Sequence, residues 1–162
     1  MLSTGLLTYR ETALLYDPNI STAMAQQKIA AVIAHEQAHM WFGDLVTCDW
    51  WKYTWLNEGF ARFYQYFGTA MVEKDWDLGL QFIVDQLHIV FASDSYETTR
   101  PLSFDVNTPD EVQGVFDSIS YNKGASVIRM IEHIIGTNNF KSAIKDYLKT
   151  KYVTSCSIVQ QC

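Results

Sequence analysis

Two histidines and a glutamate are spaced in this sequence so that they can hold and use a metal ion. His35, Glu36 and His39 form an H-E-x-x-H pattern inside a predicted helix, from about Ser21 to Phe42. Positions i and i+4 lie on one face of a helix about a turn apart, so both imidazoles can hold one zinc ion. Glu36 projects beside them without being needed as a ligand, which suits a carrier of protons. The pattern therefore predicts zinc-assisted attack of water on a carbonyl.

A catalytic zinc site with two histidines needs one more carboxylate and leaves its fourth position to water. Glu58 follows His39 with eighteen residues between them, near the start of a second predicted helix. A loop of that length allows the second helix to fold back beside the first. Asp44 and Asp49 lie in this loop and are the alternative ligands. We expect Glu58 to be the third ligand.

The oxyanion that forms during such an attack would be stabilised by a neutral phenol that donates a hydrogen bond. Tyr121 is the candidate donor, although it is one of nine tyrosines and the residues alone favour a packing role for it. No pattern of other metal-ligand residues accompanies His88 or His133 in the sequence. Both are therefore interpreted as ordinary histidines that lie on the surface or have their hydrogen bonds satisfied.

Helical spacing of apolar residues predicts the elements that position these side chains. After the first helix, we expect helices at 55–67, at 76–91, from Thr108 onward, at 125–135 and from 137 to 148. Thr108 begins a capping box with proline in the first turn, and Thr137 is expected to cap the last helix. Gly43 and Gly136 are placed to end helices. Residues 5–11 are β-compatible, so the fold class is mainly α, or α+β overall, with a short strand region at the N-terminus.

The composition is that of one globular domain. Hydrophobic residues make up 48% of the 162 residues, which is too many for a disordered chain. The net charge of −6 comes without a basic cluster, so no nucleic-acid partner is expected. Three cysteines without C-x-x-C spacing indicate neither a disulfide framework nor a cysteine zinc site. No apolar run is long enough to span a membrane, and residues 1–4 do not resemble a signal peptide.

Four ordered strings resemble the gluzincin zinc aminopeptidases related to alanyl aminopeptidase, also called aminopeptidase N. They are GLLTYRE at 5–11, VIAHEQAHMWFGDLVT at 32–47, WLNEGFA at 55–61 and FDSISYNKGASV at 116–127. The resemblance covers about residues 5–151. It implies one zinc ion on His35, His39 and Glu58, Glu36 as the proton shuttle, and Tyr121 as the transition-state donor. It also implies a thermolysin-like catalytic fold and release of neutral N-terminal residues from peptides that have a free N-terminus.

Two departures from the family pattern are visible. Met1-Leu2-Ser3-Thr4 stands where the family places a Gly-Ala-Met-Glu-Asn strand, whose glutamate grips the substrate's free amine. Residues 152–162 form an atypical tail where the family continues with further helices. The sequence is therefore expected to be a single partial catalytic domain over 1–162, a fragment or an aberrant gene product. The segments that would decide its cellular location are not in this sequence.

Three functions are compatible with these observations. The first is the catalytic core of a zinc metalloaminopeptidase, in which zinc-activated water hydrolyses the bond after the N-terminal residue. The second is a non-catalytic remnant that binds zinc or partners without turnover. The third is an endopeptidase of the wider H-E-x-x-H group. The second-shell partners of the ligands are open, with Glu11, Asp44 and Asp117 as candidates.

Overall fold

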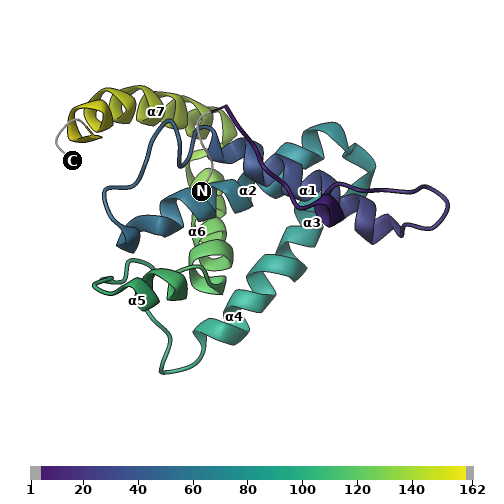
Figure 1. Cartoon of the computed structure of the whole chain (residues 1–162), viewed down its shortest axis with the longest axis horizontal. Coiled ribbons are helices and arrows are strands. Elements are labelled where there is room, and N and C mark those ends of the chain that lie inside the picture. Colours follow the sequence, from purple (N-terminus) through teal and green to yellow (C-terminus); the bar gives the residue numbers. More distant parts are fainter. Residues whose placement is uncertain (1–4, 160–162) are drawn as a thin grey trace.

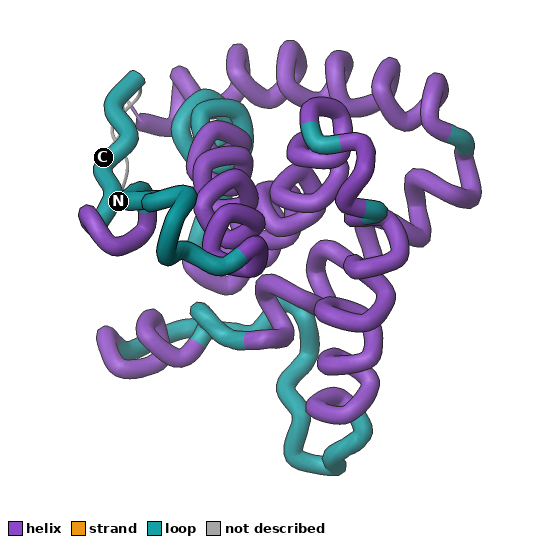
Figure 2. The backbone as a smooth tube through the Cα atoms, turned by 90° about the vertical axis from the view of Figure 1, so that its right-hand side faces the viewer, coloured by secondary structure: helices purple, strands orange, loops and turns teal. Residues whose placement is uncertain are grey.

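The computed structural model describes residues 5–159, with side chains as far as residue 152 (Figure 1). Residues 1–4 and the last three residues of the tail lie outside the described residues. The helices, in chain order, are α1 (Ala23–His39), α2 (Thr54–Val72), α3 (Leu78–Phe82), α4 (Ile89–Asp94), α5 (Pro109–Gly114), α6 (Gly124–Ile135) and α7 (Thr137–Val159). The described chain is mainly helical, as expected, with long loops between α1 and α2 and between α4 and α5 (Figure 2).

The prediction of a strand at residues 5–11 is wrong, since no strand is present among the described residues. A short 3₁₀ turn, Glu11–Ala13, ends this segment, and the remainder is irregular. A strand is stable only when another strand pairs with it, and the described part of the chain offers no such neighbour. Residues 14–22, with a turn at 18–20, connect this segment to α1, whose N-cap residue Thr22 accepts a hydrogen bond from the amide of Ala25 at 3.1 Å.

Several predicted helix boundaries needed correction. The first helix is three residues shorter at its C-terminal end than expected, and α2 extends to Val72 rather than to residue 67. The helix expected at 76–91 is a composite of α3, a π-helical segment (Ile83–His88) and α4. The capping box at Thr108 is confirmed. Thr137, expected as a cap, is instead the first residue of α7, and its hydroxyl donates to Glu132.

The central element is α2, which packs against α1, α3, α6 and a second π-helical segment, Ile119–Lys123. Aromatic residues recur along α2 and are buried on more than one side, so the helix needs neighbours all round. The core cluster comprises Phe42, Phe60, Phe63, Tyr66, Leu78, Phe82, Ala125, Ile128 and Phe140. Phe42 and Phe60 stack with ring centroids 4.3 Å apart, which ties the turn after α1 to α2.

A close contact between α2 and α6 fixes the position of the second π-helical segment. A Cβ atom added to Gly59 would lie 3.0 Å from the backbone carbon of Gly124, and one added to Gly124 would lie 3.2 Å from the Cα of Gly59. Only two glycines permit backbones to approach this closely. Because Glu58 precedes Gly59 and Tyr121 lies just before Gly124, this contact brings both site candidates to one place.

Candidate metal centre

Three ligand-type side chains from α1 and α2 converge on one point. The Nε2 atoms of His35 and His39 are 3.2 Å apart, and each lies 3.3 Å from Oε2 of Glu58. The side chains are almost buried, with exposed fractions of 10%, 12% and 11% in that order. Donors placed about 2.05 Å from a tetrahedral metal ion lie about 3.3 Å from one another. The spacing of the three atoms therefore suits such an ion.

The other sequence candidates are not in this group. Neither Asp44 nor Asp49 contributes to the cluster of possible metal ligands among the described residues. His88 is exposed, and His133 pairs with the neighbouring Glu132 on the surface. Of the three possible carboxylate ligands, only Glu58 is brought to the two histidines.

A backbone carbonyl orients one of the two imidazoles. Nδ1 of His39 lies 3.0 Å from the carbonyl oxygen of Phe42, which can accept a hydrogen bond from a protonated Nδ1. That tautomer leaves a lone pair on Nε2, on the side of the ring that faces Glu58. Gly43, with φ of 138°, allows the tight turn at this point, since an added Cβ would lie 3.4 Å from His39 Nδ1.

The acidic second-shell candidates are not confirmed. Asp117 accepts two hydrogen bonds from Arg100, from Nε at 2.9 Å and from Nη2 at 2.5 Å. Glu11 is exposed, and Asp44 has a buried Oδ2 with no hydrogen-bond partner among the described residues. The carbonyl of Phe42 was missed because backbone atoms have no signature in the sequence.

The buried histidines and carboxylate alter one another's protonation. Burial raises the pKa of Glu58, but hydrogen bonds and charge from His35 and His39 outweigh it and lower that pKa to about 2. Burial lowers the pKa of His39, whereas Glu58 raises it more, so the pKa of His39 lies above its ordinary value. The site therefore carries a carboxylate over nearly the whole pH range and attracts a cation.

Tyr121 lies beside this cluster rather than in a distant core position. Its ring stacks on the ring of His35, with centroids 5.9 Å apart and an interplanar angle of 16°. Burial raises the pKa of Tyr121 well above its usual value, and the nearby Glu58 and Glu36 carboxylates raise it further. The phenol is consequently neutral at neutral pH and able to donate a hydrogen bond.

Glu36, next to His35 on α1, is half-buried. Its charge contributes to the raised pKa values of both His39 and Tyr121, which places the carboxylate within electrostatic reach of both. The five residues singled out from the sequence are thus gathered in one place, although they come from three segments separated by up to 86 positions.

Arg62 is a site residue that the sequence reasoning missed. Its guanidinium carbon lies 5.2 Å from the centre of the Tyr121 ring, and the charge of Glu58 acts on it. The sequence feature that could have identified Arg62 is its position four residues after Glu58, which puts both side chains on one face of α2.

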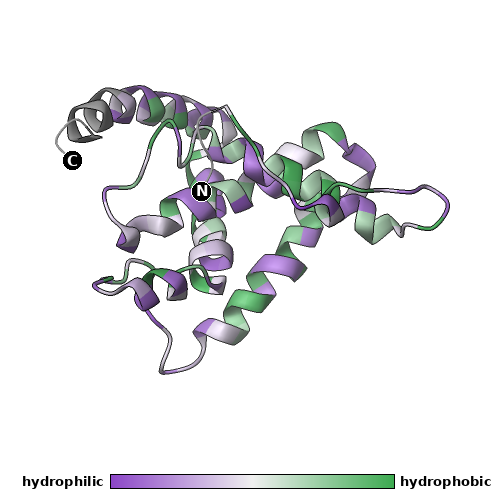
Figure 3. Cartoon of the chain, viewed as in Figure 1, coloured by the Kyte–Doolittle hydropathy of each residue, from purple (hydrophilic) through white to green (hydrophobic). Residues whose placement is uncertain are grey.

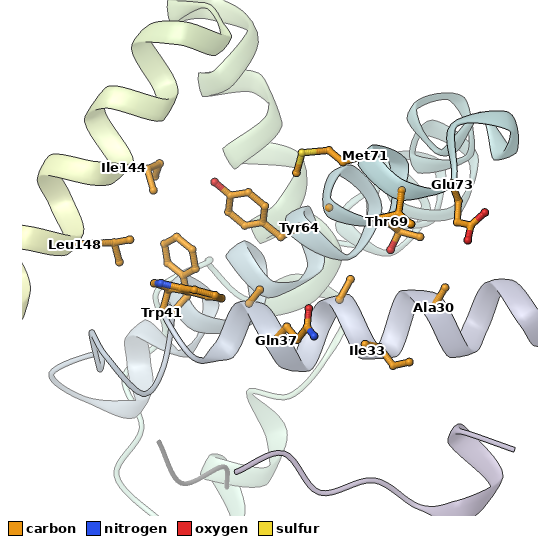
Figure 4. Close-up of a pocket in the computed structure, with 15 residues that line it drawn as sticks. Ala30, Ile33, Gln37, Trp41, Tyr64, Thr69, Met71, Glu73, Ile144 and Leu148 are labelled. Atoms are coloured by element: carbon orange, nitrogen blue, oxygen red, sulfur yellow. The ribbon is translucent and has the colours of Figure 1, made fainter. Parts of the chain in front are cut away.

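A cavity of about 610 Å³ lies between α1, α2 and α7, away from the metal cluster (Figure 4). Figure 4 shows that Ile33 and Gln37 of α1 and Trp41 just after this helix line it together with Ile144 and Leu148 of α7. None of the five candidate catalytic or metal residues contributes to its lining. The cavity is therefore distinct from the metal cluster.

Comparison with known proteins gives consistent matches over nearly the whole chain. The sequence profile of the Peptidase family M1 domain matches residues 1–160. Glutamyl aminopeptidase from Bos taurus is 51% identical over 145 residues, and Aminopeptidase N from Oryctolagus cuniculus is 46% identical over 149 residues. Each match covers 90% of this chain but 15% of the relative. The chain thus spans about one seventh of the length of these relatives.

Proposed function

The chain belongs to peptidase family M1, a family of metallopeptidases, and we propose that it contains the zinc-dependent catalytic centre of an aminopeptidase. The observation on which this proposal rests is the mutual spacing of 3.2–3.3 Å among His35 Nε2, His39 Nε2 and Glu58 Oε2. Two imidazoles and one carboxylate form the ligand set of many catalytic zinc sites. The thermolysin-like arrangement of the catalytic domain and its extent over residues 1–162 are part of the same proposal.

In the proposed mechanism, His35, His39 and Glu58 would hold one zinc ion. Zinc bound there would supply Lewis acidity, which would lower the pKa of a water molecule and polarise the scissile carbonyl. Glu36 accepts the proton released as the water attacks, and it then delivers that proton to the nitrogen of the departing amine. The peptide bond breaks and leaves a new carboxylate on one product and a new amino group on the other.

Tyr121 donates its phenolic hydrogen to the oxyanion of the tetrahedral intermediate. A neutral phenol suits this role, because a donor must keep its proton at the working pH. The stacking of the Tyr121 ring on His35 restricts where the hydroxyl points. This role is supported by the position of Tyr121 next to the cluster, which favours a hydrogen-bond donor over a side chain that serves packing alone.

The test is hydrolysis of alanyl p-nitroanilide and of its N-acetylated form by the zinc-loaded chain. We expect release from the free amine alone, loss of activity after chelation, and recovery with one equivalent of zinc. Glu36→Gln should bind zinc normally and lose about 100-fold to 10,000-fold in turnover, and Tyr121→Phe about 100-fold to 1000-fold.

The other outcomes identify the alternative functions. Zinc bound without any turnover would indicate a chain that binds metal but is not a peptidase by itself. Hydrolysis of the acetylated substrate would indicate an endopeptidase. Unchanged activity in Glu36→Gln would contradict its role as the proton carrier.

A further inference from the structure

Two side chains from other helices contact the ring of Tyr121, which lies in the π-helical segment Ile119–Lys123. The ring of His35, on α1, stacks with it at 5.9 Å between centroids. The guanidinium carbon of Arg62, on α2, lies over it at 5.2 Å from the ring centre. The direction of the phenol therefore depends on both neighbours, and of the two only His35 has a role in the proposed zinc site.

The guanidinium of Arg62 is itself held by a neighbour on the same helix. Its Nη1 donates to Oε1 of Gln65 at 3.0 Å, three residues further along α2. A second cavity, of about 740 Å³, lies between α1, α2 and the α3–α4 segment, and both side chains line it. Packing is thus incomplete on this side of the guanidinium, so the hydrogen bond to Gln65 determines where the planar group lies.

Arg62 is not held in this position by an ion pair. None of the ion pairs among the described residues includes it, and its buried Nε has no hydrogen-bond partner there. Burial lowers the pKa of the guanidinium, because a cation is costly to hold away from water. The face of an aromatic ring attracts a cation, most strongly where water is excluded. The Tyr121 ring therefore supplies part of the attraction that a carboxylate would supply elsewhere.

We propose that Arg62 is a positioning residue for Tyr121, whose ring its guanidinium holds in the orientation from which the hydroxyl donates to the oxyanion. The inference rests on the proposed function, in which Tyr121 is that donor. A hydrogen bond weakens steeply as its geometry departs from linear, so a ring that is free to tilt donates less well. A planar cation over the ring restricts this tilt.

The first test observes the Tyr121 ring directly and needs no turnover. Nuclear magnetic resonance of the chain with isotope-labelled tyrosine rings, with and without zinc, reports how fast each ring turns. The signal that Tyr121→Phe removes belongs to Tyr121. Arg62→Met keeps the length of the side chain but removes its charge and its planar group. We expect the ring to turn about tenfold faster in Arg62→Met, with a smaller increase in Arg62→Lys, which keeps a charge.

Arg129 provides the matched control. Its guanidinium carbon lies 5.2 Å from the centre of the Phe82 ring, and its Nε is also buried without a hydrogen-bond partner among the described residues. Arg129→Met removes an equivalent contact from another ring, so it should leave the motion of Tyr121 unchanged. Circular dichroism reports whether each variant is folded.

The second test separates positioning from a general loss of structure. Turnover of alanyl p-nitroanilide is compared in the parent chain, Arg62→Met, Tyr121→Phe and the double variant. Arg62→Met should lower kcat about tenfold with KM nearly unchanged, because the hydroxyl acts on the transition state. Arg62→Lys should recover part of that loss. In Tyr121→Phe, which keeps the ring without its hydroxyl, Arg62→Met should change kcat by less than about twofold.

Motion of the Tyr121 ring that is the same in Arg62→Met as in the parent chain would overturn the proposal. So would a decrease in kcat that is equal with and without the Tyr121 hydroxyl, because Arg62 would then support the fold rather than the phenol. Failure of the proposed function is distinguishable. A chain without any turnover contradicts the peptidase, while the motion of the ring still decides whether Arg62 holds Tyr121.

Discussion

At the scale of single residues, the candidate site brings together groups that are costly to assemble without a metal. Two imidazole nitrogens face each other at 3.2 Å, and a carboxylate oxygen lies near both. If both Nε2 atoms are unprotonated, their lone pairs repel each other. A proton or a metal ion between the groups removes that repulsion, so protons and metal compete for one position.

This competition predicts the pH dependence of stability in the metal-free chain. The pKa of Glu58 is lowered to about 2 in the fold, so its contribution is present above pH 4.5 and lost as pH falls towards 2. The pKa of His39 is raised above 6.5, so its contribution is present below pH 6.5 and lost as pH rises through the raised value. Urea unfolding with a chelator should therefore give a maximum between about pH 4.5 and 6.5.

Zinc should change the upper limit of this range. Above the raised pKa of His39 the imidazole is available as a neutral ligand, and zinc then restores the stability that the lost proton had supplied. Glu58→Gln should remove the dependence at both ends. A free energy of unfolding that does not vary with pH in the chelated chain would show that the three groups are not coupled.

At the scale of elements, the site depends on close approach and on π-helical turns. Tyr121 lies in the segment Ile119–Lys123, which leads directly into α6. π-helical turns are uncommon and frequent at functional sites, because the additional residue in the turn redirects a side chain. The Gly59–Gly124 contact then holds this turn against α2.

Gly59→Ala tests the importance of this contact. The new methyl group would lie 3.0–3.1 Å from backbone atoms of Gly124, which cannot move independently of the helix. We expect a loss of about 1–3 kcal/mol in the free energy of unfolding. Gly68→Ala is the matched control in the same helix, because its nearest atom is 4.0 Å away, and a gain of about 0.4–1 kcal/mol is expected there. Equal effects in the two variants would contradict the close-contact explanation.

A second prediction concerns the anchor of the π-helical turn. Oδ1 of Asp117 accepts hydrogen bonds from the amides of Ile119 and Ser120, at 3.1 and 3.0 Å, while Arg100 binds both carboxylate oxygens. Asp117→Ala leaves the largely buried Arg100 without its carboxylate partner and removes the acceptor of two amides of the turn, so denaturant unfolding should show a loss of about 2–3 kcal/mol.

The surface pair between Lys52 and Asp105 is the control for this prediction. Asp105 is 82% exposed, so Asp105→Ala should cost less than about 1 kcal/mol. If the two aspartate variants lost the same stability, Arg100 and Asp117 would be no more than a surface pair.

At the scale of the whole molecule, much apolar surface is exposed. Figure 3 shows hydrophobic bands along the α3–α4 segment, where Val84, Ile89 and Phe91 are each at least half exposed. Met71 and Val72, at the end of α2, are also exposed beside the cavity under α7. No helix in the described part of the chain is long and apolar enough to cross a membrane. Exposed apolar side chains in such number should take up a small apolar molecule.

A neutral apolar dye such as Nile red should therefore bind the native chain and fluoresce. Met71 is 67% exposed and lines the cavity under α7, so Met71→Gln should lower the signal without loss of structure. Ile20, which is 82% exposed and lines neither cavity described above, serves as the control, and Ile20→Gln should have little effect. An equal decrease in both variants would indicate nonspecific dye binding.

The sequence by itself determined features that depend on neighbouring residues. The i and i+4 histidines on a helix, the capping box at Thr108 and the helix end at Gly136 involve a few consecutive residues whose backbone geometry is local. Its family resemblance also singled out Glu58 and Tyr121, which spacing alone left uncertain. The mainly helical class followed from the apolar period.

Only the tertiary structure decided the features that join distant segments or involve backbone atoms. The carbonyl of Phe42 behind His39, the contact of Gly59 with Gly124, and Arg62 over Tyr121 leave no periodic pattern in the sequence. The strand expected at residues 5–11 failed for the same reason, since strand formation depends on a partner that the local sequence does not contain. Local propensity specifies helices, whereas the packing of those helices specifies which polar groups meet.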